Sequence, residues 1–155
     1  MDRVPITKEG YEALKNDLEY LKKVERPKNL KAIEEALSHG DLSENAEFEA
    51  AKDRQAFVDA KLNELEYKLS RAEIIDAETL PKDRVVFASF VVLENIETGE
   101  HVEYQLVGPD ESDIENGRIS VSSPLGKAMI GKKPGDEITF QVPGGTRSFE
   151  LIDIL

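Results

Sequence analysis

The sequence predicts a two-domain α+β protein, with a long antiparallel helical hairpin at residues 1–78 and a small α+β domain at residues 79–155. Two observations lead to this prediction. Over the first half, apolar residues recur in alternating steps of three and four, the spacing of helices that pack along one another. From about residue 80 the period changes to two, and β-branched and aromatic residues become frequent, which is typical of strands.

The first arm of the hairpin is expected at residues 7–38, with Thr7 as the N-cap. Pro27 lacks an amide hydrogen and disfavours helical geometry at Arg26, so we expect a kink or short break there. The apolar seam of this arm comprises Leu14, Leu18 and Leu21 before the proline and Leu30, Ile33 and Leu37 after it.

The second arm is expected at residues 43–75. Its seam comprises Val58, Leu62, Leu65, Leu69 and Ala72. The connection between the arms is short, so the helices should be antiparallel neighbours that reach ~45 to 50 Å at ~1.5 Å per residue. Gly40 is suited to end the first helix. The bend would therefore be the far tip of a rod.

The second half reads as strands, turns and one short helix. We expect strands at 85–95 and 101–108, a short strand within 117–123, a turn or two of helix at 124–131, and strands at 136–142 and 147–155. Pro124 suits the first position of the short helix. The acidic loop at 108–117 is apolar only at Ile114 and should lie in solvent.

Composition limits the function. The chain has 32 acidic and 20 basic side chains and a net charge of −12, so it repels phosphate and should reach nucleic acid only through a partner. Cysteine is absent, which removes disulfides, thiolate catalysis and cysteine-ligated zinc. The N-terminus has no apolar run of a signal peptide, and no membrane-spanning stretch occurs. We expect a soluble, cytoplasmic protein.

The bend, at residues 39–53, is crowded with carboxylates. In a structural interpretation, Asp41 is an N-cap and Glu44, three residues later, completes a capping box. In a functional interpretation, both carboxylates face forward and bind magnesium. Two carboxylates are too few to bind the ion alone, so the pair would complete a site in another protein, where a second ion activates water in phosphoryl chemistry.

No other catalytic group competes with the bend. Neither the G-x-S-x-G motif nor the Walker loop is present. His39 and His101 lie in different halves, and a lone histidine is more often a surface or capping residue than a ligand.

Several motifs together are similar to those of the GreA family of bacterial transcript cleavage factors. They are HGDLSENAEFEAAKDRQ at 39–55, RP at 26–27, ISVSSPLGKAMIGKKPGDEI at 119–138 and VPGG at 142–145. The resemblance extends over essentially the whole chain. It implies an N-terminal antiparallel coiled coil and a C-terminal FKBP-like domain. It also implies that the coiled coil enters the secondary channel of bacterial RNA polymerase.

By the same resemblance, Asp41 and Glu44 would help to hold a second magnesium ion and the attacking water, so that backtracked nascent RNA is cut near its 3′ end. The polymerase would remain the nuclease, and the chain itself would not be an enzyme. Mg would be held jointly with the polymerase and not stably by this chain alone. Capping remains compatible with this role, and Asn45 is a further candidate at the tip.

Two further regions match functional parts of the family. Lys52 and Arg54 occupy the basic patch that contacts RNA, although Leu37 stands where some members have a basic residue; the alternative for both is ordinary pairing with neighbouring acids. The segment expected to dock on a coiled coil at the channel rim comprises Ser122, Ser123, Pro124, Leu125 and Gly126, with Ser123 a candidate N-cap.

Two alternatives remain open. The protein could be a regulator that occupies the same channel and inhibits the polymerase without stimulating cleavage. It could instead be a prolyl isomerase or chaperone. Tryptophan is absent and the chain has only four tyrosines and six phenylalanines, so we do not expect a well-formed aromatic proline pocket.

Overall fold

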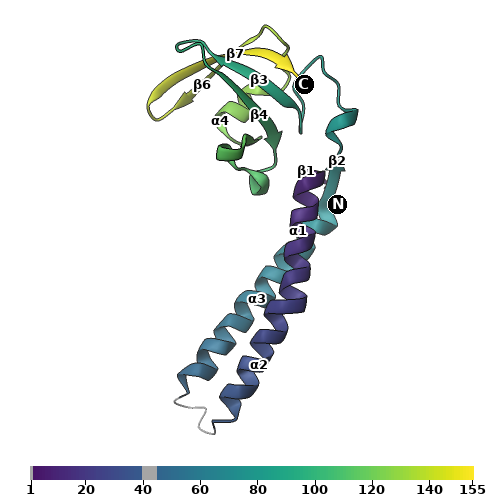
Figure 1. Ribbon diagram of the computed structural model, residues 1–155, viewed down its shortest axis with the longest axis vertical. Coiled ribbons are helices and arrows are strands. Elements are labelled where there is room, and N and C mark those ends of the chain that lie inside the picture. The colour runs from purple at the N-terminus through teal and green to yellow at the C-terminus, as the bar shows by residue number, and fades with distance from the viewer. Residues whose placement is uncertain (1, 40–44) are drawn as a thin grey trace. The chain divides into compact units, whose positions relative to one another are not determined.

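The computed structural model describes residues 2–39 and 45–155, and Figure 1 shows their secondary structure. It contains a helical hairpin and a curled sheet with a short helix, so the predicted α+β fold with two parts is confirmed. The chain divides into two compact units: one combines Met1–Asp2 with Tyr11–Ala72, and the other combines Arg3–Gly10 with Glu73–Leu155. The predicted domain boundary at 78/79 stays a prediction. Within the described residues, no helix is long and apolar enough to cross a membrane.

The first arm consists of α1 (Lys8–Tyr20), a π-helix at Leu21–Glu25, and α2 (Arg26–Leu37). Thr7 is the N-cap of α1, as predicted, because its Oγ1 accepts a hydrogen bond of 3.0 Å from the backbone N–H of Gly10. A kink or short break was predicted at Arg26. The break is wrong, since this residue is helical with φ −64° and ψ −49° and its N–H donates to the carbonyl of Leu21; the kink stays a prediction. The π-turn shifts the carbonyls before Pro27 out of α register, which lets the helix continue.

The continuous helix determines which face of α2 is buried. An unbroken α-helix would bring Lys28, Ala32 and Glu35 to the seam that Leu21 begins, at 3.6 residues per turn. The extra residue of the π-turn moves the seam by one position. Asn29 and Ala36 are buried there, 6% and 1% exposed, whereas Leu30 and Leu37 are each 45% exposed. The prediction that Leu30 and Leu37 lie in the seam is therefore wrong.

The second arm is α3 (Ala46–Arg71), which lies beside α2 (Figure 1). Contacts between the arms are antiparallel: Lys22 pairs with Glu66 at 3.2 Å, and Asn29 Nδ2 donates to the carbonyl of Ala51 at 2.9 Å. The apolar core of the hairpin comprises Leu21, Val58, Leu62 and Leu65, with Leu14 and Leu18 packed against it. These six residues were all predicted to be seam residues. Ala72 was predicted to continue the helix but begins a strand.

One exposed cluster on α3 perturbs a carboxyl group. Lys68 and Lys61 lie 3.0 Å and 3.3 Å from the carboxylate oxygens of Glu64. Their hydrogen bonds, that of Lys68 first, lower the pKa of Glu64 below its ordinary value. The ionised form of Glu64 is therefore favoured in the folded hairpin.

The second unit is built on a five-stranded sheet with the order β5-β4-β3-β7-β6. Its strands are β3 (Phe90–Asn95), β4 (His101–Val107), β5 (Arg118–Ser120), β6 (Glu137–Val142) and β7 (Gly145–Ile154). All neighbouring strands are antiparallel except β4 and β5, which are parallel. The short helix α4 (Pro124–Met129) packs against this sheet (Figure 1). The sheet and α4 share a core formed by Val85, Val91, Leu93, Leu106, Ile119, Leu125, Met129, Ile138, Leu151 and Ile154.

Three features of this unit differ from the prediction. Residues 85–89 are not part of a strand, because Ala88 has φ +72° and β3 begins only at Phe90. A two-stranded sheet of β1 (Val4–Thr7) and β2 (Ala72–Ile75) was not predicted. The acidic loop does not lie wholly in solvent, since the side chain of Glu111 is only 5% exposed.

Candidate functional site

The predicted acidic pair at the tip, Asp41 and Glu44, lies outside the described residues. The described residues on either side are His39, which follows α2, and Asn45, which precedes α3. Their contacts show how the two helices are joined at this end of the hairpin.

Asn45 connects the two arms. It is the N-cap of α3, with its Oδ1 accepting from the backbone N–H of Phe48 at 3.0 Å. Its Nδ2 donates to the carbonyl of Ala36 at 2.7 Å, so the same side chain also binds the last turn of α2. The prediction that Asp41 caps the second helix is wrong, because α3 begins at Ala46 and Asn45 performs that role. The carboxylates of the tip are therefore not needed to cap α3.

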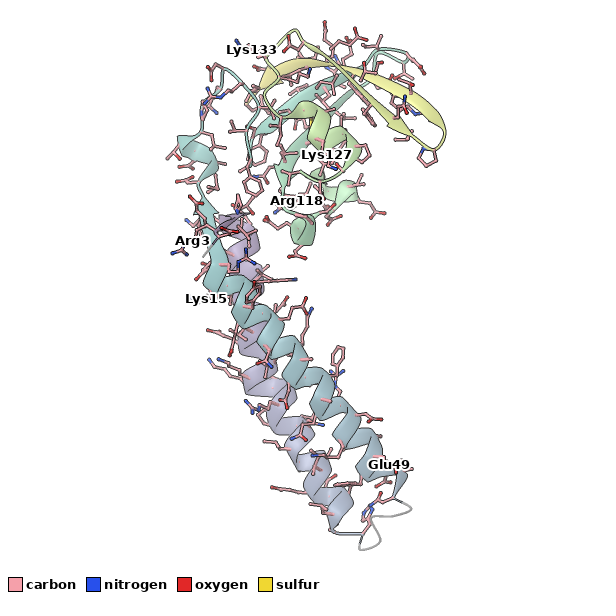
Figure 2. The ribbon with its side chains drawn as sticks, turned by 180° about the vertical axis from the view of Figure 1, so that it is seen from behind. Arg3, Lys15, Glu49, Arg118, Lys127 and Lys133 are labelled. Carbon is pink, nitrogen blue, oxygen red and sulfur yellow. The ribbon has the colours of Figure 1, made fainter. Side chains whose placement is uncertain are left out.

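The first turn of α3 remains acidic beyond the cap. It contains Glu47 and Glu49, which favour the positive end of the helix dipole; Figure 2 labels Glu49. His39 Nδ1 lies 3.2 Å from Glu47 Oε2, and both side chains are exposed. In the described part of the chain, no three histidine or acidic side chains are placed to hold a metal ion together.

The two basic residues predicted to contact RNA have different surroundings. Lys52 Nζ donates to the neutral amide of Gln55 at 2.8 Å. Arg54 Nη2 lies 3.0 Å from Glu25 on the other arm, and its guanidinium lies 4.9 Å from the centre of the Phe57 ring. Pairing with an acid therefore describes Arg54, although the partner is across the hairpin, and does not describe Lys52. Contact of either residue with RNA stays a prediction.

The predicted docking segment forms the start of α4. Ser123 is the N-cap, as predicted, because its Oγ accepts from the N–H of Gly126 at 3.0 Å; the same hydroxyl donates to the carbonyl of Ser120 at 2.6 Å. A Cβ on Gly126 would overlap that carbonyl, so only glycine fits there. Leu125 and Gly126 are buried, whereas Ser122 and Pro124 are exposed.

Beside this segment the second unit is hollowed. A hollow of ≈ 390 Å³ is lined by Ser123, Pro124, Leu125, Tyr104, Phe140 and Phe149, among others. The rings of Phe140 and Phe149 are stacked with their centres 5.9 Å apart. Three of the ten aromatic residues thus line one hollow, and the expectation that no well-formed aromatic proline pocket exists stays a prediction.

Comparison with known protein families gives two matches, one in each half of the chain. The family profile described as "Transcription elongation factor, N-terminal" matches residues 4–74, and the profile described as "Transcription elongation factor, GreA/GreB, C-term" matches residues 80–155.

Individual relatives match over nearly their whole length. The transcription elongation factor GreA of Syntrophus aciditrophicus is 53% identical over 154 residues, which cover 99% of this chain and 96% of that protein. GreA of Neisseria meningitidis serogroup A is 51% identical and covers 99% and 98%. Among solved structures, GreA factor homolog 1 (Gfh1) of Thermus thermophilus is 33% identical, covers 99% of both chains and has a TM-score of 0.44.

Proposed function

Because the chain belongs to the GreA/GreB family of transcription elongation factors, we propose that it inserts the tip of its hairpin into the secondary channel of bacterial RNA polymerase. There it stimulates the polymerase's own Mg-dependent cleavage of backtracked nascent RNA and so rescues arrested complexes. The observation that carries the proposal is the tip motif, with Asp41 and Glu44, in a chain about half identical to named GreA proteins along its whole length.

The acidic pair fits magnesium by its chemistry. Carboxylate oxygens are the ligands that Mg²⁺ prefers, but the ion takes six, so Asp41 and Glu44 would share it with the polymerase. When bound, the ion activates water for in-line attack on a phosphodiester. Asn45 supports this role because it caps α3 and holds the end of α2. It thus joins the two helices that flank the tip.

The other predicted residues would act on binding rather than on chemistry. Lys52, which donates to the neutral amide of Gln55, is the better candidate for contact with the RNA phosphates, and Arg54 would contribute where it is not held by Glu25. The docking segment would present Ser122 and Pro124 to the polymerase, while the buried Leu125 and Gly126 keep its shape. In this proposal the chain completes an active site and has no complete active site of its own.

The test is RNA cleavage in a halted, backtracked elongation complex with magnesium. The Asp41→Asn/Glu44→Gln variant keeps the size of both side chains and removes their charge. Stimulation should fall roughly 100-fold, the scale of a lost electrostatic stabiliser. Binding to the polymerase, measured by competition with the unchanged protein, should stay the same.

The matched control is Glu49→Gln, which removes one exposed carboxylate from the first turn of the same helix. It should cleave like the unchanged protein. If the unchanged protein binds, slows nucleotide addition and stimulates no cleavage, the inhibitory regulator replaces this proposal.

A further inference from the structure

The side chain of Glu111 is a buried carboxylate in a loop whose composition predicted exposure. Glu111 ends the 3-10 turn Pro109–Glu111, and 5% of its side chain is exposed. Both oxygens accept hydrogen bonds. Oε2 accepts from the backbone N–H of Thr7 at 3.3 Å and of Gly108 at 3.1 Å, and Oε1 accepts from Arg118 Nη2 at 3.0 Å and from the hydroxyl of Thr7.

The cation that pairs with Glu111 is itself fixed. Arg118, labelled in Figure 2, donates through Nη1 to Gln105 Oε1 at 3.0 Å and through Nε to the backbone carbonyl of Glu111 at 3.3 Å. Gln105 is 4% exposed and donates to the carbonyl of Ala88 at 3.2 Å. Arg118 Nη2 also donates to the Thr7 hydroxyl at 3.2 Å. The ion pair therefore has little freedom to move.

The hydrogen bonds to Glu111 hold Thr7 in one place. A buried carboxylate is strongly unfavourable unless charged donors and N–H groups surround it. Two of the four donors come from Thr7, which is 1% exposed and lies 104 residues away in sequence. Removing Thr7 from its place would leave the buried charge with half of its donors. The Glu111 carboxylate thus fixes Thr7, the N-cap of α1.

The first turn of α1 is shaped to fit the same carboxylate. Gly10 is buried in this turn, and a Cβ built on it would overlap Oε1 and Cδ of Glu111. Glycine inside a helix is less favourable than alanine. The four hydrogen bonds prevent the Glu111 side chain from turning away, so the close approach accounts for the glycine.

We propose that Glu111 is a positioning residue that fixes the start of the hairpin. Thr7 and Gly10 belong to the same compact unit as Glu111, and α1 continues from Gly10 into the hairpin at Tyr11. The first turn of α1, up to Gly10, is therefore held by this carboxylate within the second unit. Its effect on RNA cleavage rests on the proposed function, whereas its hold on α1 does not.

The hold on α1 is tested without the polymerase, by amide hydrogen exchange of Glu111→Gln. This variant keeps the shape of the side chain and removes its charge. Exchange in residues 8–12 should speed up about tenfold or more, the scale of one hydrogen bond to a charged group, while β3 and β7 stay protected. Glu115→Gln, an exposed acid in the same loop, should change nothing. An equal loss of protection throughout the unit would overturn the proposal.

The close contact between Gly10 and Glu111 can also be tested by comparing one substitution in two backgrounds, which gives an answer even if Glu111→Gln folds poorly. Gly10→Ala should lower the folding equilibrium constant of the unchanged protein, because its Cβ overlaps Glu111. In a Glu111→Ala background the overlap disappears, and the same substitution should raise the constant up to about fivefold through helix propensity. The same sign in both backgrounds would refute the contact.

The consequence for activity is a change in the maximal rate and not in affinity. With Glu111→Gln, cleavage at saturating factor should fall about tenfold, while the concentration giving half the maximal effect changes less than about twofold. Full recovery at high concentration would show a loss of stability or binding alone. If the unchanged protein stimulates no cleavage, the proposed function fails, and the exchange result still decides the role of Glu111.

Discussion

Replacing Asn29 with aspartate should destabilise the hairpin strongly and in a pH-dependent way. Asn29 is 6% exposed, and its Nδ2 donates to the backbone carbonyl of Ala51 at 2.9 Å. An ionised aspartate would place a charged oxygen against that carbonyl, which is itself an acceptor. The carboxyl group escapes this repulsion by taking up a proton, which restores a donor toward Ala51.

The magnitude follows from that protonation. An unperturbed aspartate has a pKa of about 3.9, and each pH unit above it corresponds to about 1.36 kcal/mol. Folding with a protonated side chain therefore costs at most about 5 kcal/mol at about pH 7.5 and about 2 kcal/mol at about pH 5.5. The folded-state pKa is raised above the unfolded one, so the folded protein binds more protons and its stability falls as pH rises. The sequence pI is ≈ 4.7, so the protein stays negatively charged at both pH values.

The assay is chemical denaturation followed by the helical circular dichroism signal. Asn29→Asp should lose about 3 kcal/mol or more at the higher pH and clearly less at the lower. Asn29→Ala should lose about 1 to 2 kcal/mol at both, because it removes one hydrogen bond without adding a charge. The matched control is Asn63→Asp on the exposed surface of α3, which should stay within about 0.5 kcal/mol. If Asn29→Asp matches that control at both pH values, the buried contact to Ala51 does not exist.

Three further outcomes are expected. Gly126→Ala should destabilise the second unit by about 1 to 3 kcal/mol in thermal unfolding, because its Cβ overlaps the carbonyl of Ser120, and should weaken polymerase binding; a more stable variant would contradict this. Lys52→Ala should leave stability within about 0.5 kcal/mol yet reduce cross-linking to backtracked RNA, whereas unchanged cross-linking would remove Lys52 from the RNA surface. The pKa of Glu64 is lowered in the folded protein, so its stabilising effect is present above the unfolded carboxyl pKa and is lost as pH falls through the folded pKa. The free energies of unfolding of Glu64→Gln and of the unchanged protein should therefore converge in acid. A difference that stays constant with pH would show that the contacts with Lys61 and Lys68 do not cause the stabilisation.

Sequence periodicity predicted the hairpin where one face alone carries apolar residues. Val58, Leu62 and Leu65 are buried as expected, because their steps of four and three place them on one face of α3. It failed at Leu30 and Leu37. The side of α2 on which they lie depends on a backbone hydrogen bond from Arg26 to Leu21, which cannot be predicted from the residue types. Local spacing therefore predicts a helix more reliably than it predicts which face a preceding turn will present.

Contacts between residues far apart in sequence could not be predicted, for a different reason. Glu111 looked like a solvent residue because its neighbours in sequence are polar, and its donors come from Thr7 and Arg118. The tip motif was recognisable, yet the two bonds of Asn45 become visible only when the end of α2 lies beside the start of α3. Residue types thus identified a candidate site, whereas the side chains that position it required the fold.

At the π-helix, Leu21–Glu25, the first arm should tolerate the deletion of one residue. Because the π-helix contains one residue more than an α-turn needs, deletion of an exposed residue such as Val24 would return this turn to α register and leave Asn29, Ile33 and Ala36 facing α3. A deletion further along α2 has no extra residue to remove, so it would rotate the rest of the helix by about 100°. Gaps in alignments of this arm should therefore gather at the π-helix, and a relative one residue shorter there would still carry its tip in the same orientation.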